Sequence, residues 1–191
     1  MMKKMSIYLA LSLASALSCQ ALAEQPEQAA AEPLKQWNVG IGSYATTINV
    51  DGNHGDEDLD FSGLNLAGTY AFNDNVAIRA GYYSLDFDDD SELESSGLDL
   101  LAYYGTGFAT EGFKAYIGGG FFTDTWEAEG EDEDFSGIQL NGGIGYNWEF
   151  VSLELMLGIR SADDYADFIE DLGGNGDVTA ISSSLLLSAR F

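Results

Sequence analysis

The sequence predicts an all-β fold, an eight-stranded antiparallel up-and-down transmembrane β-barrel. Three observations lead to this prediction. Apolar residues recur at every second position in eight segments between residues 37 and 191, the connections between these segments alternate between short and long, and the chain holds 23 glycines but only two prolines. Because residues two apart lie on the same face of a strand, each segment is typical of a strand with one apolar face.

The first 23 residues have the layout of a secretory signal peptide. Lys3 and Lys4 precede an apolar run, and the run ends in Ala21-Leu22-Ala23, an A-x-A cleavage site. A membrane anchor is the alternative, but this run is shorter than the roughly 20 residues that a spanning helix needs. We therefore expect cleavage after residue 23, a flexible periplasmic leader over residues 24–36 and a barrel over 37–191.

The one cysteine, Cys19, lies in the segment that cleavage would remove. The mature chain is then predicted to have no thiol for a disulfide, a metal or a nucleophile. A lipoprotein acylated at Cys19 is the competing hypothesis, and Ala16 stands where leucine is usual in such signals.

The eight strands follow from the period of two. On the first four, the apolar face is Trp37, Val39 and Ile41; then Leu64, Leu66, Tyr70 and Phe72; then Val76, Ile78, Ala80 and Tyr82; then Leu98, Leu100, Ala102, Tyr104 and Phe108. On the last four it is Phe113, Ala115, Ile117 and Phe121; then Ile138, Leu140, Ile144, Tyr146 and Trp148; then Val151, Leu153, Leu155, Leu157 and Ile159; then Ile181, Leu185, Leu187, Ala189 and Phe191. None of these positions is charged.

The connections alternate in length along the chain. Tight turns are expected at 73–75, 109–112 and 149–150, and long loops around 50–60, 86–96, 124–135 and 161–177. This alternation indicates an antiparallel meander. In an outer-membrane barrel the short turns are periplasmic and the long loops extracellular.

The apolar face could point outward to lipid or, as in a lipocalin, inward around a ligand. The opposite face is rich in Gly, Ser and Asn, which suits the narrow interior of an eight-stranded barrel. Aromatic residues of the apolar face also gather at the short-turn end, as in the girdle of a membrane interface. They are Trp37, Phe72, Phe108, Phe113, Tyr146, Trp148 and Phe191. We therefore expect the apolar face to contact lipid.

A signal peptide, eight alternating strands and a last strand that ends in Phe191 resemble the small OmpA/OmpX-type outer-membrane barrels of Gram-negative bacteria. The resemblance covers residues 37–191 and implies location in the cell outer membrane. It also implies that the barrel-assembly machinery recognises the strand ending in Phe191. The peptidoglycan-binding domain that follows the barrel in OmpA is not expected here.

Charged residues of the strands share the polar face and are expected in the lumen. They are Arg79, Lys114, Glu154, Arg160 and Arg190, with Asp99 as a further candidate partner. Because an unpaired buried charge is costly, these residues are predicted to form a lumen charge network. Similar barrels carry such an internal salt-bridge plug. A packed, closed core is favoured over a gated, porin-like ion channel.

Acidic residues crowd the expected loops, and the formal net charge is −25. This charge excludes nucleic acid as a partner. Carboxylates could hold divalent cations that bridge the loops to each other or to lipopolysaccharide phosphates. Asp86, Asp88, Asp90 and Glu92 begin like a calcium loop, but the glycine and the final glutamate of that motif are missing. We therefore predict no specific metal site and no cofactor.

His54, the one histidine, and the pair Asp90-Ser91 faintly resemble the residues of outer-membrane palmitoyltransferases. His54 lies in a Gly- and Asp-rich segment that is poorly suited to hold a general base in place. The sequence therefore favours a non-enzymatic outer-membrane protein that contributes to envelope integrity or surface interaction through acidic extracellular loops. A narrow channel and a lipid A-modifying enzyme are the alternatives.

Overall fold

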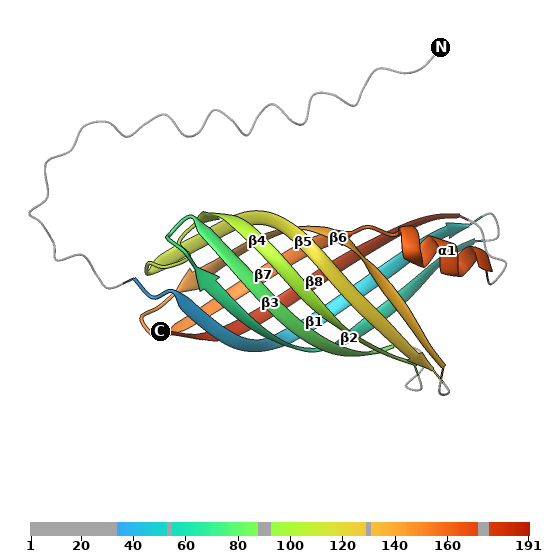
Figure 1. The fold of residues 1–191 in the computed structure, drawn as a ribbon, viewed down its shortest axis with the longest axis horizontal. Coiled ribbons are helices and arrows are strands. Elements are labelled where there is room, and N and C mark those ends of the chain that lie inside the picture. The colour runs from blue at the N-terminus through green and yellow to red at the C-terminus, as the bar shows by residue number, and fades with distance from the viewer. Residues whose placement is uncertain (1–33, 53–54, 88–92, 129–130, 172–175) are drawn as a thin grey trace, which may run out of the picture. The chain divides into compact units, whose positions relative to one another are not determined.

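A computed structural model describes residues 34–52, 55–87, 93–128, 131–171 and 176–191. The predicted signal peptide and the leader up to residue 33 lie outside these residues. Eight antiparallel strands pair in chain order, and the last pairs with the first, so the sheet closes into a barrel (Figure 1). The predicted fold class is confirmed.

The elements follow one another as a meander. The strands are β1 (Trp37–Gly52), β2 (Gly55–Ala71), β3 (Val76–Phe87), β4 (Leu93–Thr106), β5 (Gly112–Ala128), β6 (Glu131–Asn147), β7 (Val151–Arg160) and β8 (Gly176–Arg190). One helix, α1 (Asp163–Asp171), lies between β7 and β8. No helix among the described residues has the length and apolar character of a membrane span.

The barrel closes where the two ends of the sheet meet. The amide of Trp37 donates to the carbonyl of Phe191 at 2.9 Å, and the amide of Phe191 donates to the carbonyl of Trp37 at 3.0 Å. Strands β1 and β8 stay paired from there up to Gly52 and Gly176. A closed sheet has no free edge, so its backbone groups need neither water nor another chain.

The apolar face of the strands points outward. Large apolar side chains with the predicted parity are exposed on every strand, for example Leu66 at 56%, Ile117 at 70% and Leu157 at 58%. Such a continuous exposed belt is untenable in water and matches the lipid-facing band of a membrane barrel. The lipocalin alternative is therefore wrong.

One member of the predicted aromatic girdle does not belong to it. Phe108 is fully buried, whereas Trp37, Phe113 and Phe191 are exposed as expected. Strand β4 ends before this residue, and Gly107 takes a φ of +79°, a left-handed conformation that glycine tolerates. The turn therefore directs the Phe108 ring into the short-turn end of the barrel instead of toward lipid.

The three short turns are confirmed, but the long loops are shorter than predicted. Residues expected in loops around 50–60, 86–96 and 124–135 belong mostly to β1 to β6. Polar cross-strand pairs extend the ladders there. The Thr47 hydroxyl donates to Asp60 at 2.6 Å, and the Asn49 amide donates to Asp58 at 2.7 Å. The expected loop 161–177 also holds α1, which lies at the end of the barrel opposite the C-terminus (Figure 1).

Candidate functional site

The lumen is filled by large side chains on one wall and small ones on the other. Strands β3, β4 and β5 contribute bulky buried residues, whereas β8 contributes three serines beside Ala180, Leu186 and Arg190. The bulky residues are Tyr83, Leu85, Leu101, Tyr103, Tyr116 and Phe122, and the serines are Ser182, Ser184 and Ser188. The sequence analysis expected a lumen of small and singly charged residues and missed this aromatic filling. Both faces of β3 to β5 carry apolar residues, so the apolar character of a residue such as Tyr83 or Phe122 did not by itself mark it as a lumen side chain.

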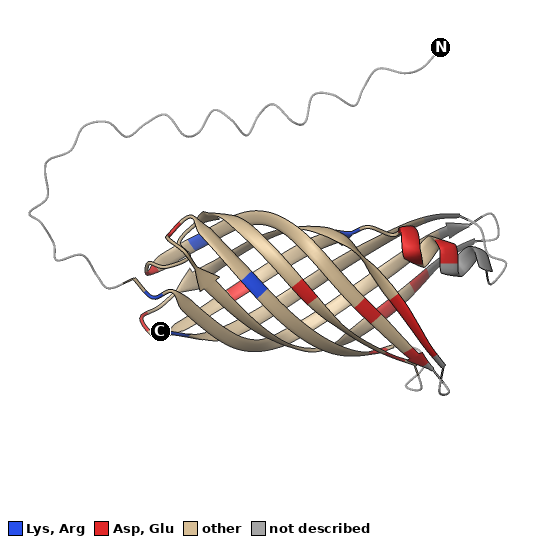
Figure 2. Cartoon of the chain, viewed as in Figure 1, with Lys and Arg blue, Asp and Glu red and all other residues tan. Residues whose placement is uncertain are grey.

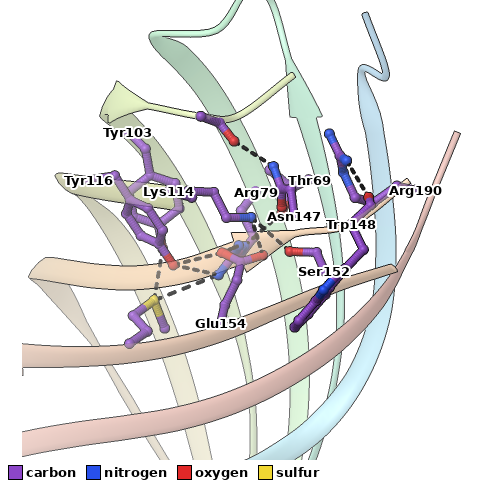
Figure 3. A network of polar contacts seen from close by, with 12 residues as sticks. Thr69, Arg79, Tyr103, Lys114, Tyr116, Asn147, Trp148, Ser152, Glu154 and Arg190 are labelled. Carbon is purple, nitrogen blue, oxygen red and sulfur yellow. Dashed lines mark hydrogen bonds and ion pairs between the residues drawn. The ribbon is translucent and has the colours of Figure 1, made fainter. Parts of the chain in front are cut away.

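Glu154 on β7 is the centre of one charged cluster (Figure 3). Its carboxylate accepts from Arg79 Nη2 at 2.7 Å and from the Tyr116 hydroxyl at 2.9 Å, and lies 2.8 Å from Lys114 Nζ. All three charged side chains are almost fully buried. Lys114 also donates to the Ser152 hydroxyl at 3.1 Å. One carboxylate therefore holds two cations from strands β3 and β5.

Arg160 on β7 is the centre of a second cluster, nearer to α1. Its Nη2 donates to the Tyr44 hydroxyl at 2.7 Å and to Asp99 Oδ1 at 3.3 Å. Tyr44 in turn donates to Asp99 Oδ2, and Gln139 donates to Oδ1 at 2.6 Å. The guanidinium also lies 4.6 Å from the centre of the Phe122 ring, a cation–π contact.

Asp124 on β5 ties α1 to the lumen. Its carboxylate accepts from Ser95 at 2.6 Å, from the Trp126 indole at 3.1 Å and from the Tyr165 hydroxyl of α1 at 3.0 Å. Asp124 is 2% exposed. The sequence analysis assigned it to the acids of a long loop, which is wrong, because β5 carries it inside the barrel. The residues that donate to Asp124 lie on different elements, so the spacing of residues in the sequence could not predict these hydrogen bonds.

Tyr165 closes the barrel at the α1 end. Its side chain is 1% exposed, and its ring packs 4.8 Å from Phe135 and 5.7 Å from Trp126, measured between ring centres. Burial raises the pKa of Tyr165 well above its ordinary value, and nearby Asp124 raises it further. The hydroxyl is therefore a neutral hydrogen-bond donor. Asp164 anchors the same helix by accepting from the Ser136 amide at 2.9 Å.

Phe108 closes the opposite end, and Asp74 holds it there. The ring packs 5.4 Å from Tyr116, between centres. Asp74 accepts from the amides of Gly107, Ala109 and Thr110 at 3.1 to 3.2 Å and from the Thr110 hydroxyl at 2.8 Å. Partial burial alone would raise the pKa of Asp74, but these hydrogen bonds outweigh it and lower the pKa.

The six predicted lumen charges therefore form two clusters and one separate residue. Arg79, Lys114 and Glu154 share one cluster, and Asp99 and Arg160 share the other. Arg190 instead donates to the carbonyls of Trp148 at 2.6 Å and Thr110 at 3.0 Å, and it forms no ion pair with another described residue.

The other candidate residues lie largely beyond the described part of the chain. His54, Asp88, Asp90, Ser91 and Glu92 fall outside it, and Asp86 is an exposed residue of β3. Within the described ranges, no group of three or more His, Cys, Asp or Glu could hold a metal ion.

Four exposed acids form a row on the outer face of the barrel, beyond the apolar belt. Asp86 pairs with Glu94, Glu94 with Glu127, and Glu127 with Asp132, on the adjacent strands β3, β4, β5 and β6. All four side chains have outward parity and are exposed. Figure 2 shows that Asp and Glu gather toward the end that carries α1. We call these four residues the acidic row.

The sequence profile of the outer membrane protein beta-barrel domain matches residues 9–191. The chain belongs to this outer-membrane β-barrel family. A comparison with curated protein sequences finds no significant match.

Solved structures share this architecture. The attachment invasion locus protein Ail of Yersinia pestis is 14% identical, with a TM-score of 0.52 over 83% of this chain and 99% of that one. OprG of Pseudomonas aeruginosa is 14% identical, with a TM-score of 0.53 over 83% of this chain and 97% of that one. Neisserial surface protein A is also 14% identical, with a TM-score of 0.50 over 80% and 97%. At this identity the likeness concerns the fold.

Proposed function

We propose that this outer-membrane barrel is a non-enzymatic envelope protein in which neighbouring pairs of the acidic row share divalent cations with lipopolysaccharide phosphates, which supply the remaining oxygen ligands. The α1 end would face the cell exterior, as the short turns at the other end suggest. In this role the protein stabilises the outer leaflet or offers an anionic surface to partners.

The acidic row carries the proposal. Directly opposite like charges on neighbouring strands are destabilising, and the row contains three such pairs in succession. Carboxylates at about 6 Å repel by about 0.7 kcal/mol in water, and salt weakens this repulsion. Oxygen ligands are those that Ca²⁺ and Mg²⁺ prefer, so a shared cation would turn the repulsion into cohesion.

The neighbouring outward acids differ from the row, because hydrogen bonds already engage them. Asp60 accepts from Thr47, Asp58 from Asn49, and Asp134 from the Thr125 hydroxyl at 2.7 Å. Members of the row form no ion pair with another described residue, since the four ion pairs of the described chain all lie in the lumen. A bound cation would therefore stabilise the acidic row more than it would stabilise the neighbouring acids that are already hydrogen-bonded.

The filled lumen supports an envelope role over the narrow channel. Tyr165 occupies one mouth and Phe108 the other, both almost fully buried. Between them, Arg79, Glu154 and Lys114 join opposite parts of the wall. An ion would have to displace two aromatic plugs and break buried ion pairs to cross.

Export and assembly complete the proposal. Cleavage after Ala23 would release the chain into the periplasm, and the barrel-assembly machinery would recognise the last strand. Phe191 is 63% exposed and bonded through its backbone to Trp37, so its side chain is free for recognition. We expect Phe191→Ala to lower the assembled fraction in cells several-fold while refolding of the purified chain into detergent is unchanged. Equal losses in both assays would indicate a purely structural role.

The cation proposal is tested by thermal unfolding in bilayers with and without lipopolysaccharide, at several Ca²⁺ concentrations. We expect Ca²⁺ to raise the unfolding midpoint most when lipopolysaccharide is present, and Glu94→Gln with Glu127→Gln to remove most of this rise. Asp58→Asn with Asp60→Asn is the matched control, because it removes the same charge from acids that are already hydrogen-bonded. If both double variants reduce the rise equally, the effect is general charge screening and the proposal is wrong.

A further inference from the structure

The chain just before β1, which the sequence analysis assigned to a flexible leader, is bound to the barrel. Gln36 extends the β1–β2 ladder by one residue. The Ala71 amide donates to its carbonyl at 2.8 Å, and its side-chain amide donates to the Ala71 carbonyl at 3.1 Å. Lys35 then leaves the ladder, and its backbone amide donates to the carbonyl of Ala109 at 3.1 Å. Ala109 belongs to the turn between β4 and β5, so the chain contacts a second turn of the short-turn end.

The Lys35 side chain reaches a third turn. Its ammonium group donates to the carbonyl of Glu149 and lies 3.9 Å from the centre of the Phe150 ring, a cation–π contact. Both partners belong to the turn between β6 and β7, and Glu149 lies 114 residues from Lys35 in the sequence. Two consecutive residues therefore join the end of β2 to the β4–β5 turn and the β6–β7 turn.

The contacts of Lys35 require a closed barrel. Neighbouring strands lie about 4.8 Å apart, so in an open sheet β1 and β6 would be separated by about 24 Å. Lys35 can therefore meet the β6–β7 turn only after β1 has joined β8, which the bonds between Trp37 and Phe191 accomplish. Contacts that are absent from the folding transition state leave the folding rate unchanged but slow unfolding.

The same contacts hold the turn that carries Phe108. Ala109 follows Phe108 directly, and its amide donates to Asp74 at 3.2 Å while its carbonyl accepts from Lys35. Asp74 belongs to the β2–β3 turn, so the β4–β5 turn is bound both by its neighbouring turn and by the chain before β1. Lys35 therefore also helps to keep the Phe108 ring in the end of the lumen.

We propose that Lys35 and Gln36 form a latch, which closes after the ring of strands is complete and slows its reopening. Because Gln36 directly precedes Trp37, the latch resists the separation of β1 from β8, the strand pair at which the ring would reopen. The latch lies at the end of the barrel that carries the C-terminus, whereas the acidic row lies toward α1 (Figure 1). Either proposal can therefore fail without the other.

The test compares the rate of folding into phospholipid vesicles with the rate of unfolding in urea, both followed by tryptophan fluorescence. Lys35→Met keeps an apolar stem but removes the charge. We expect it to raise the unfolding rate about tenfold, as for one lost hydrogen bond to a charged group, and to change the folding rate less than about twofold. Leu34→Ala is the control, because Leu34 directly precedes the latch and is 55% exposed. It should change neither rate.

A second pair of variants tests the contact from its other side. Phe150→Leu removes the ring that Lys35 contacts. Phe113→Leu makes the same change at a residue of equal exposure, 62%, which lies over no cation of the described chain. We expect only Phe150→Leu to speed unfolding, and the effect of Lys35→Met to shrink when the two changes are combined, because the residues interact.

Two results would overturn the latch. Slower folding of Lys35→Met would mean that its contacts form before the barrel closes. Unfolding of Lys35→Met no faster than that of the Leu34→Ala control would mean that residues 35 and 36 are only a linker.

Discussion

Replacement of Glu154 by glutamine removes an acid that holds two buried cations. Arg79 and Lys114 both rely on this carboxylate, and their side chains are 4% and 1% exposed. Glutamine keeps nearly the same shape, so packing against Tyr116 is retained. The substitution therefore isolates the loss of negative charge from the loss of volume.

The expected cost follows from the buried geometry. Removing one partner of a buried ion pair typically costs about 3–5 kcal/mol, because the remaining charge stays desolvated. Here two cations remain, although glutamine retains an acceptor and Ser152 still accepts from Lys114. We expect a loss of about 4 kcal/mol in the free energy of unfolding, near the middle of the range for one broken pair.

Urea unfolding in phospholipid vesicles, followed by tryptophan fluorescence, measures this loss. With a slope of about 2 kcal/mol per molar urea, the midpoint should fall by about 2 M. Glu149→Gln is the control, since it makes the same chemical change at an exposed residue of the adjacent turn. A loss below about 1 kcal/mol for Glu154→Gln is what an exposed surface ion pair contributes. Such a result would refute the conclusion that Arg79, Lys114 and Glu154 form a water-excluded cluster of interacting charges.

Three further predictions concern the ends of the barrel. Tyr165→Ala should open the α1 end of the barrel, so that acrylamide quenches the fluorescence of Trp126 in a variant whose other tryptophans are replaced by phenylalanine. Tyr165→Phe keeps the ring and should leave Trp126 largely protected. Equal quenching in both variants would contradict the role of the Tyr165 ring in closing this end. Asp74 has a lowered pKa, so its contribution to stability is intact above its ordinary value of 3.8 and is lost as the pH falls through the lower value in the folded state. Asp74→Asn should therefore flatten the acid decline of the urea midpoint between about pH 5 and about pH 2, and an unchanged decline would count against this assignment. Gly107→Ala places a Cβ 2.5 Å from a backbone oxygen at a φ of +79°, and should lower the thermal midpoint by several degrees, as expected for a loss of about 1–3 kcal/mol. Gly68→Ala, which meets nothing within 4 Å, should leave the midpoint nearly unchanged, and equal effects would argue against backbone strain.

The barrel itself was predictable because one face of each strand must contact lipid. On β7, every second residue from Val151 to Ile159 is a large aliphatic one, and the exposed fractions follow the same period of two. This pattern predicts whether each side chain faces the lipid or the lumen without knowledge of which strands lie beside it. It therefore predicted which charges, such as Arg160 and Glu154, point inward.

Features that depend on neighbouring strands could not be predicted in this way. Asp124 was placed in a loop because acids surround it in the sequence, yet its donors come from β4, β5 and α1. The strands also continue past the apolar belt, where Thr47 and Asn49 pair with acids on β2. A hydrogen bond between two strands cannot be recognised from the apolar periodicity of one segment. The polar ends of strands therefore look like loops in the sequence.

Phe108 was misplaced for a local reason. It continues the parity of β4, but the strand ends before it and Gly107 reverses the chain. Glycine permits this conformation without requiring it, so the sequence alone leaves both outcomes open.

The hydrogen bonds between Trp37 and Phe191 also constrain how the protein enters its membrane. They join the two ends of a sheet whose every other pairing links neighbours in sequence, so the ring is complete only when its most distant residues meet. Any shorter arc would present two rows of unpaired amides and carbonyls to hydrocarbon, at several kcal/mol for each unsatisfied group. Insertion of a partial sheet is thus disfavoured at every stage, and strand closure and passage into the bilayer are expected to be one concerted event.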